Sequence, residues 1–293
     1  MTEFKGRTAV ITGAGSGFGR EFALIGASRG MNLVLADIQA DALAETERMV
    51  SERGASVLAV PTDVGDPASV DALRDACLQR FGAPGLLFNN AGVAVGGLAW
   101  ENTVADWEWV LRVNLWGVIH GVRAFVPAML EAGRPAHVVN TASVAGLLAP
   151  PTMAVYNVSK HGVVAYSETL YHDLQMIKSS IGVSVLCPAF VSTGIVDSGR
   201  NRPAGLRSDA PPTNAQQAAE AAMAKAIRSA KVTAAEVARM TFDAIEQDRF
   251  YIITHPPIMD SVRLRVQDVA ELRKPTNPFS LRQDVAPSAG DRS

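Results

Sequence analysis

The sequence predicts an α/β protein built on one doubly wound parallel sheet of about seven strands, with helices on both faces. Short apolar, strand-like runs recur along the chain, and most gaps between them hold a helix-length amphipathic pattern. No Gly/Ser/Pro-rich linker divides the first 190 residues. This alternation implies parallel strands that are covered on both faces. The expected strands lie near residues 8–12, 32–37, 56–62, 85–89, 136–141, 182–187 and 250–254.

The bulk properties favour one domain. The 293 residues are 48% hydrophobic, which is ample for a sizeable core. We expect a single domain over residues 1–273, with an insertion at about 194–235 that combines a polar loop with an Ala-rich helical stretch. The remaining residues, 274–293, are predicted to form a polar C-terminal tail.

Charge and hydropathy exclude several kinds of partner. The net charge of −2 gives no basic surface of the kind that binds nucleic acid. The N-terminal residues lack the basic and then apolar segments of a signal peptide, and no uninterrupted apolar run reaches about 18 residues. The five histidines are scattered without ligand spacing. We therefore expect no nucleic-acid partner, no membrane partner, no metal site and a cytoplasmic location.

The first strand leads into a helix through a glycine-rich turn. Residues 7–19 read RTAVITGAGSGFG, and a helical pattern continues from Phe18 to Arg29. In this context glycines allow a tight turn and let a pyrophosphate approach the helix N-terminus, where free N–H groups attract anions. The sequence thus predicts a Rossmann-type dinucleotide site that includes Gly13, Ser16, Gly17, Phe18 and Gly19.

The second strand, NLVLAD, ends in an acidic residue. Asp37 follows Gly19 by eighteen positions. A carboxylate at this point can accept hydrogen bonds from the adenosine ribose hydroxyls and would repel a 2′-phosphate. Neither Ser16 nor Ile38 offers that phosphate a positive charge. The sequence therefore favours NAD over NADP as cofactor.

Two long helices are expected further along, at about 103–131 and 152–178. The first contains Asn114 within an apolar run, an expensive place for an amide unless it is paired. Between the helices, Ser143 follows the strand-like AHVVNTAS and should stand at the carboxyl end of a strand, where open α/β sheets bind ligands.

The start of the second long helix carries a tyrosine and a lysine four residues apart. In a helix these positions share one face, so the ammonium of Lys160 should lie near the phenol of Tyr156. We expect the cation to lower the pKa of the phenol towards the range in which it can act as a general base. Tyr166 and Tyr171 lie on the same predicted helix but have no basic residue four positions on.

Taken together, these motifs resemble the short-chain dehydrogenase/reductase family, in its single-domain branch. The resemblance runs from about residue 7 to 255. It rests on TGAGSGFG (Thr12–Gly19), NNAG (Asn89–Gly92), Asn114 in VNLWG, Ser143, and YNVSK (Tyr156–Lys160). It implies a catalytic tetrad of Asn114, Ser143, Tyr156 and Lys160, in which Asn114 anchors a water that links Lys160 to solvent. The thirteen-residue spacing to Tyr156 favours Ser143 over the neighbouring hydroxyl of Thr141.

The resemblance also implies further contacts to the cofactor. Asp63 and Val64 match the position of the adenine contact, although an Asp here can equally be a capping residue. The remaining matches are Asn90, Ala91, Gly92, Pro188, Val191 and Thr193, in addition to Tyr156 and Lys160. The family usually has Gly after the proline, whereas this chain has Ala189.

The substrate is predicted from the apolar residues around this site. Candidates for the lining are Ser143, Leu147, Leu148, Met153, Phe190 and Ile195. No Arg or Lys is placed to bind a carboxylate, which favours a hydrophobic secondary alcohol or ketone, although each apolar residue could equally pack the core. The resemblance implies a homo-oligomer, a tetramer or a dimer, formed through the two long helices.

Two other functions remain open at this point. An NAD-dependent epimerase or dehydratase shares Tyr-x-x-x-Lys, but that branch differs at the glycine turn and needs more chain after Phe250. A regulator that senses dinucleotides without turnover typically lacks the Tyr or the Lys, and both are present here.

Overall fold

The computed structural model describes residues 3–207 and 210–281, and within these ranges seven strands form one parallel sheet. The strand order is β3-β2-β1-β4-β5-β6-β7, so the direction of winding reverses between β1 and β4. The strands are β1 (Thr8–Thr12), β2 (Asn32–Asp37), β3 (Val57–Pro61), β4 (Leu86–Asn89), β5 (Ala136–Thr141), β6 (Ile181–Cys187) and β7 (Tyr251–Ile253). The predicted fold class is confirmed, and each expected strand starts and ends within one residue of the observed one.

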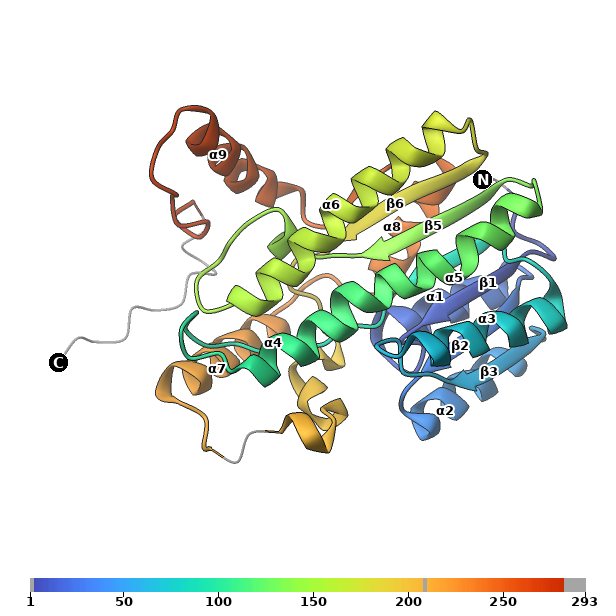
Figure 1. The fold of residues 1–293 in the computed structure, drawn as a ribbon, viewed down its shortest axis with the longest axis horizontal. Coiled ribbons are helices and arrows are strands. Elements are labelled where there is room, and N and C mark those ends of the chain that lie inside the picture. The colour runs from blue at the N-terminus through green and yellow to red at the C-terminus, as the bar shows by residue number, and fades with distance from the viewer. Residues whose placement is uncertain (1–2, 208–209, 282–293) are drawn as a thin grey trace.

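Helices cover both faces of this sheet (Figure 1). One core cluster joins the sheet to α1 (Gly17–Ser28), α2 (Ala40–Ser51) and α8 (Ala234–Glu246). A second cluster joins the other face to α3 (Pro67–Phe81), α5 (Gly117–Glu131) and α6 (Ala154–Met176). Strands β1, β4 and β5 are buried along their whole length, which explains the mostly apolar sequences of β1 and β4, whereas β5 also buries the polar His137, Asn140 and Thr141.

The first long helix is interrupted at its buried asparagine. It begins as α4 (Val104–Leu111), passes through the π-helical segment η1 (Arg112–Trp116) and continues as α5. Asn114 lies in this wider turn and is fully buried. π-Helical turns of this kind occur frequently at functional sites.

In the described part of the chain, Val104–Glu131 has the length and composition of a membrane-spanning helix. More than half of its apolar window, 56%, is buried inside the protein. That is the pattern of a core helix.

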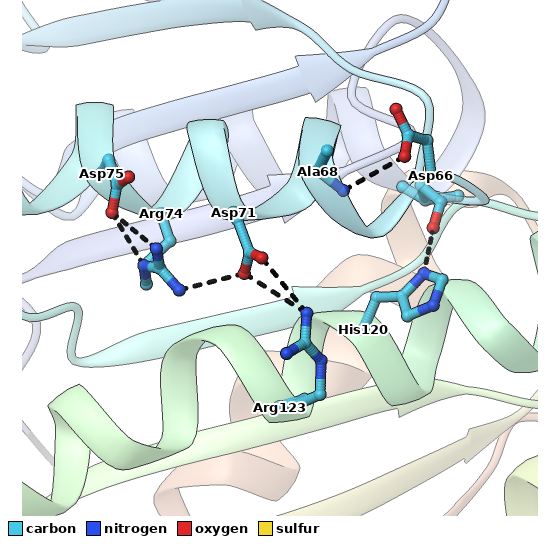
Figure 2. Close-up of polar contacts among 8 residues, drawn as sticks. Asp66, Ala68, Asp71, Arg74, Asp75, His120 and Arg123 are labelled. Carbon is cyan, nitrogen blue, oxygen red and sulfur yellow. Dashed lines mark hydrogen bonds and ion pairs between the residues drawn. The ribbon is translucent and has the colours of Figure 1, made fainter.

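Polar contacts fix α3 against α5 (Figure 2). Asp71 on α3 lies between Arg74 of the same helix and Arg123 of α5. One turn earlier on α5, the ring of His120 makes a 3.0 Å hydrogen bond with the carbonyl oxygen of Val64, in the loop that precedes α3. This buried contact fixes the loop after β3 to α5.

The predicted insertion crosses the carboxyl edge of the sheet. It contains the 3-10 helices η3 (Gly194–Asn201) and η4 (Ala204–Leu206), followed by α7 (Asn214–Arg228). Arg202 holds it to the body through a 2.6 Å ion pair with Asp106 of α4, and its guanidinium lies 5.3 Å from the ring centroid of Trp109. Both charged side chains are largely buried.

The C-terminal part adds a helix and a return segment. After β7, the short turn η5 (Pro256–Ile258) leads into α9 (Met259–Ala270). Part of the expected polar tail then folds back on α9: Thr276 donates to Asp268, and Ser261 donates to the carbonyl of Pro278. The rest of that tail, residues 282–293, lies outside the described residues.

One buried histidine links β5 to β6. Ser184 gives its hydroxyl proton to the carbonyl of Arg249 at 2.7 Å, so the Nε2–H of His137 donates to Ser184 at 2.8 Å. His137 is 1% exposed, and this burial lowers its pKa from 6.5 to about 3. The ring is therefore neutral in the fold at every pH near neutrality.

This histidine predicts a pH dependence of stability. Its folded pKa is depressed, so the unfolded chain takes up a proton as the pH falls below 6.5 while the folded chain does not, until about pH 3. Between pH 7 and 5 this difference should lower the free energy of unfolding by about 2 kcal/mol. Urea denaturation of His137→Gln should show that much less pH dependence than the wild type. His172→Asn, at an exposed histidine, is the matched control, and equal slopes for His137→Gln and the wild type would contradict the assignment.

Candidate active site

A cavity of about 690 Å³ opens at the carboxyl ends of the strands and brings most of the predicted site residues together. Strand ends at the point where the winding reverses are where open α/β sheets bind ligands. The predicted residues on its wall are Gly13, Ser16, Phe18, Asp37, Asp63, Val64, Asn90, Ala91, Gly92, Ser143, Met153, Tyr156, Lys160, Pro188, Phe190, Val191, Thr193 and Ile195. Gly17, Gly19 and Asn114 lie behind the wall and shape it, as described below.

The glycine turn is packed too closely to accept a side chain. A Cβ on Gly19 would lie 2.1 Å from the carbonyl oxygen of Gly13, and Gly13 itself has a φ of +65°. Ser16 is the N-cap of α1, and its side chain makes no capping hydrogen bond. The N-terminus of α1 therefore presents unpaired backbone N–H groups at the cavity, an arrangement suited to a phosphate.

Asp37 is held in place by backbone donors. Gly15 N–H donates to one carboxylate oxygen at 2.8 Å and Gln39 N–H to the other at 2.9 Å. Each oxygen keeps a further lone pair. The carboxylate on the cavity wall is thus oriented to accept hydrogen bonds from a ribose.

Two residues that the sequence did not single out support the neighbouring part of the wall, although they do not line the cavity themselves. Arg112 of η1 forms a 2.9 Å ion pair with Asp63 and donates to the carbonyl of Gly65 at 3.1 Å. The His120 ring is hydrogen-bonded to the Val64 carbonyl on the side away from the cavity. No local pattern marks these residues, because their partners are 47 to 56 positions away in the chain.

The NNAG segment is fixed to the end of β1. The hydroxyl of Thr12 accepts hydrogen bonds from the N–H groups of Asn90 and Ala91, at 2.9 and 3.2 Å. The Asn90 side chain donates to the carbonyl of Thr12 at 3.0 Å. Both strand ends therefore hold the backbone of this loop against the cavity.

Asn114 satisfies its buried amide with backbone and side-chain partners. Its oxygen accepts from Val93 N–H at 2.8 Å, and its nitrogen donates to the Val93 carbonyl at 2.9 Å and to Ser159 at 3.1 Å. A Cβ on Gly92 would lie 3.5 Å from the Asn114 oxygen and 3.6 Å from the Lys160 nitrogen. The amide and the amine therefore approach the same point of the loop.

Ser143, Tyr156 and Lys160 meet at the end of β5. Tyr156 and Lys160 lie on one face of α6, with the Lys160 nitrogen 5.6 Å from the centroid of the tyrosine ring. The same nitrogen donates to the carbonyl of Thr141 at 2.8 Å. The Ser143 hydroxyl donates to the carbonyl of Pro188 at 3.3 Å and lies close enough to Tyr156 to act on its pKa. All three side chains are more than nine-tenths buried.

The expected pKa of Tyr156 differs from what this environment gives. Burial raises it from 10.0 to about 12, against a smaller lowering by the hydrogen bond from Ser143. Burial also lowers the pKa of Lys160 to about 8. The tyrosine pKa in the protein alone is therefore raised, opposite to the expected lowering, because desolvation is the largest effect and Lys160 is not among the groups that shift it.

The segment after β6 completes the wall on the other side. Pro188, Val191 and Thr193 line the cavity, and the methyl carbon of Thr193 lies 3.4 Å from where a Cβ on Gly17 would be. Ala189 does not have the positive φ that would require glycine. The backbone thus passes the cavity without strain at the position where this chain differs from the family pattern.

The far end of the cavity is apolar. Of the predicted lining residues, Met153, Phe190, Ile195 and Leu148 line it, whereas Leu147 does not and packs against a separate core cluster around Val118 and Val163. The wall also includes Trp109, Met223, Ala226, Ile227, Ala230 and Phe279. The residues from α7 and its end follow helical spacing (223, 226, 227, 230), a signal that could have identified this face of the helix. Phe279 is a lone aromatic residue in a polar stretch, so no sequence pattern identifies it as a lining residue.

Within residues 3–207 and 210–281, no group of three or more His, Cys, Asp or Glu side chains could hold a metal ion. The wall fits a dinucleotide instead. The closely packed glycine turn and the unpaired N–H groups of α1 suit a pyrophosphate, the oriented Asp37 carboxylate suits a ribose, and the apolar end leaves room for a second ligand beside Tyr156.

Comparison with known proteins agrees with this geometry. Residues 7–203 match the family described as short chain dehydrogenase. The chain is 36% identical to a CLA biosynthesis dehydrogenase/reductase of Lactiplantibacillus plantarum, over 92% of this chain and 95% of that protein. It is 35% identical to a 1-deoxy-11-beta-hydroxypentalenate dehydrogenase of Streptomyces exfoliatus, over 89% of this chain and 86% of that protein. A crystal structure of a short chain dehydrogenase/reductase from Burkholderia phymatum in complex with NAD has 56% identity and a TM-score of 0.94, and the match covers 96% of this chain and all of that one.

Proposed function

Because the chain belongs to the short-chain dehydrogenase/reductase family, we propose that it interconverts a hydrophobic secondary alcohol and its ketone, with NAD as cofactor and Tyr156 as general acid/base. Family membership supports oxidoreductase chemistry with a nicotinamide dinucleotide. The observation that carries the finer proposal is that Ser143, Tyr156 and Lys160 line the same cavity as the glycine turn and Asp37.

In the proposed reaction, Ser143 and Tyr156 hold the substrate oxygen between them. Tyr156 takes the hydroxyl proton during oxidation and returns it during reduction. Bound NAD⁺ supplies the hydride acceptor together with a positive charge. Lys160, whose pKa burial lowers to about 8, places a further positive charge beside the phenol, and the two charges together are proposed to lower the tyrosine pKa that burial raises.

Asn114 is proposed to help the proton that Tyr156 takes up to reach solvent. It reaches the backbone of the NNAG loop at the point that Lys160 also approaches. A water between the amide oxygen and the lysine nitrogen would connect Lys160 to solvent. The role of Asn114 is thus to hold that path open, and no part of it requires the amide to titrate.

The preference for NAD is proposed from Asp37. Its carboxylate is fixed by Gly15 and Gln39 and would face a 2′-phosphate with a like charge. The apolar end of the cavity supports a hydrophobic substrate, since Trp109, Met153 and Phe279 form much of the wall there. The two relatives named above are described as acting in CLA biosynthesis and on 1-deoxy-11-beta-hydroxypentalenate, and we extend from them only to an apolar substrate.

We also propose that the protein forms a homo-oligomer, a dimer or a tetramer, through the face that carries η1 and α6. Trp116 and Val158 are half exposed on these neighbouring helices, at 52% and 49%. Trp109, the other tryptophan of the first long helix, is instead buried at the cavity. Exposed large apolar side chains on adjoining helices favour a subunit contact.

The catalytic assignment predicts the behaviour of Tyr156→Phe. This change removes the titrating hydroxyl and leaves the ring, so NADH binding should stay within about twofold while turnover falls at least about 100-fold. Alcohol-dependent NAD⁺ reduction and NADH fluorescence titration measure the two effects. Tyr166→Phe on the same helix is the matched control and should keep the wild-type rate. A Tyr156→Phe enzyme with near-normal turnover would eliminate Tyr156 as the acid/base.

The cofactor assignment predicts the behaviour of Asp37→Ala. Removing the carboxylate should raise the ratio of kcat/KM for NADP⁺ over NAD⁺ by about tenfold or more, because a like charge no longer faces the 2′-phosphate. Steady-state kinetics with both cofactors checks this. Asp41→Ala, at an exposed acid in the first turn of α2, should leave the ratio unchanged. An unaltered ratio in Asp37→Ala would show that discrimination lies elsewhere.

The oligomer assignment predicts that Val158→Glu gives a smaller species than the wild type in sedimentation velocity, because the new charge would be buried in the contact. Met240→Glu places the same charge on α8, on the opposite face of the sheet, and should leave the sedimentation coefficient unchanged. A wild-type protein that sediments as a monomer would refute the proposal outright.

A further inference from the structure

Arg200 of η3 reaches across the cavity mouth to the loop after β2. Its Nη1 donates to the carbonyls of Gly194 at 3.2 Å and Asp197 at 2.7 Å, within its own segment. Its Nε donates at 3.2 Å to the side-chain oxygen of Gln39, which lies 161 positions earlier in the chain. Arg200 and Gln39 both line the cavity.

These contacts place the guanidinium beside the predicted phosphate position. Its Nη2 lies 3.6 Å from where a Cβ on Gly194 would be. Gly194 follows Thr193, which packs against Gly17 at the start of α1. The cation therefore lies between the N-terminus of α1 and the Gln39 side of the ribose site, along the path that joins them.

The guanidinium has donors to spare. Arginine carries five N–H groups, and among the described residues Nη2 makes no hydrogen bond with the protein. Arg20, the basic residue on α1 itself, is already engaged with Glu45 and the carbonyl of Gly15. Of the other cations on the cavity wall of the described chain, Lys160 donates to the Thr141 carbonyl beside the tyrosine, and Lys231 makes no hydrogen bond or ion pair that would orient it. Arg200 is thus a cation held in a defined position with free donors.

We propose that Arg200 binds the pyrophosphate of the bound dinucleotide and so fastens η3 over it. A guanidinium pairs with phosphate oxygens through charge-assisted, often bidentate hydrogen bonds. The contact with Gln39 joins η3 to the loop after β2 across the cavity. In the first turn of α1 the one basic residue, Arg20, is already paired with Glu45, so Arg200 supplies the available positive charge. It does so from η3, the same segment in which Ile195 lines the cavity. This inference rests on the dinucleotide site described above and assigns it a new binding residue.

The test is a direct binding measurement. NADH is titrated by fluorescence, and ADP and adenosine are titrated in competition with it. Arg200→Ala should raise the Kd for NADH and for ADP by about ten- to hundredfold, because both carry the pyrophosphate, and should leave adenosine within about twofold. Arg200→Lys keeps the charge without the planar fork and should recover part of the loss. Raising the salt concentration should narrow the difference between Arg200→Ala and the wild type.

Two matched controls separate this role from general charge. Lys231→Ala removes a different cation from the same wall, and Arg207→Ala removes an arginine of the same insertion that does not line the cavity. Both should bind NADH as the wild type does. Arg200 is exposed, so its replacement should not disturb folding.

Three outcomes would overturn the proposal. These are an unchanged Kd for NADH and ADP in Arg200→Ala, an equal loss of NADH affinity in Lys231→Ala, and a loss of adenosine affinity in Arg200→Ala as large as the loss for NADH, which would assign the guanidinium to the ribose instead of the pyrophosphate. None of them touches the function proposed for Tyr156, since that stands or falls on turnover in Tyr156→Phe with NADH binding intact.

Discussion

The buried amide of Asn114 is the constraint on which the architecture of the site depends. An amide inside an apolar helix must find partners, and it finds them by bonding both backbone groups of Val93 and the hydroxyl of Ser159. The first contact fixes the loop after β4, and the second fixes α6 at the turn between Tyr156 and Lys160. The π-helical widening of η1 accompanies this inward-facing side chain. The same helix supplies Arg112 and His120 to the loop after β3, so one irregular helix positions three parts of the cavity wall.

Burial has opposite effects on the two titrating groups at the centre of the site. It raises the pKa of Tyr156 to about 12 and lowers that of Lys160 to about 8, so each group is driven towards its neutral form. The protein alone therefore does not hold a phenolate at neutral pH. It holds a phenol whose ionisation responds strongly to any positive charge brought into the cavity, because that charge acts in a medium with little water to screen it. Tyr156 in such a site stays protonated until a positively charged ligand enters the cavity.

The sequence predicted the parts of this structure that are encoded locally. Strands such as β1 and β4 are buried throughout and are mostly apolar in sequence, and the glycine turn has a spacing that follows from the close contact of Gly19 with Gly13. Tyr156 and Lys160 were found because helical spacing alone places them together. What could not be predicted depends on distant partners. Arg112 and Arg200 are ordinary polar residues until the fold sets them beside Asp63 and Gln39. The choice between Leu147 and Leu148 depends on the orientation of a short 3-10 turn, which no periodicity encodes.

The two carboxylate oxygens of Asp106 have different partners, one close in the sequence and one distant. One oxygen accepts from the N–H and hydroxyl of Thr103 and closes the first turn of α4. The other pairs with Arg202, which is synthesised 96 residues later. The first turn of α4 thus orients this carboxylate through contacts that lie within three residues, and the same carboxylate receives an arginine from the distant insertion. The cavity-covering insertion is therefore held by a residue whose position is set by the start of a helix, so a change at Thr103 would loosen both.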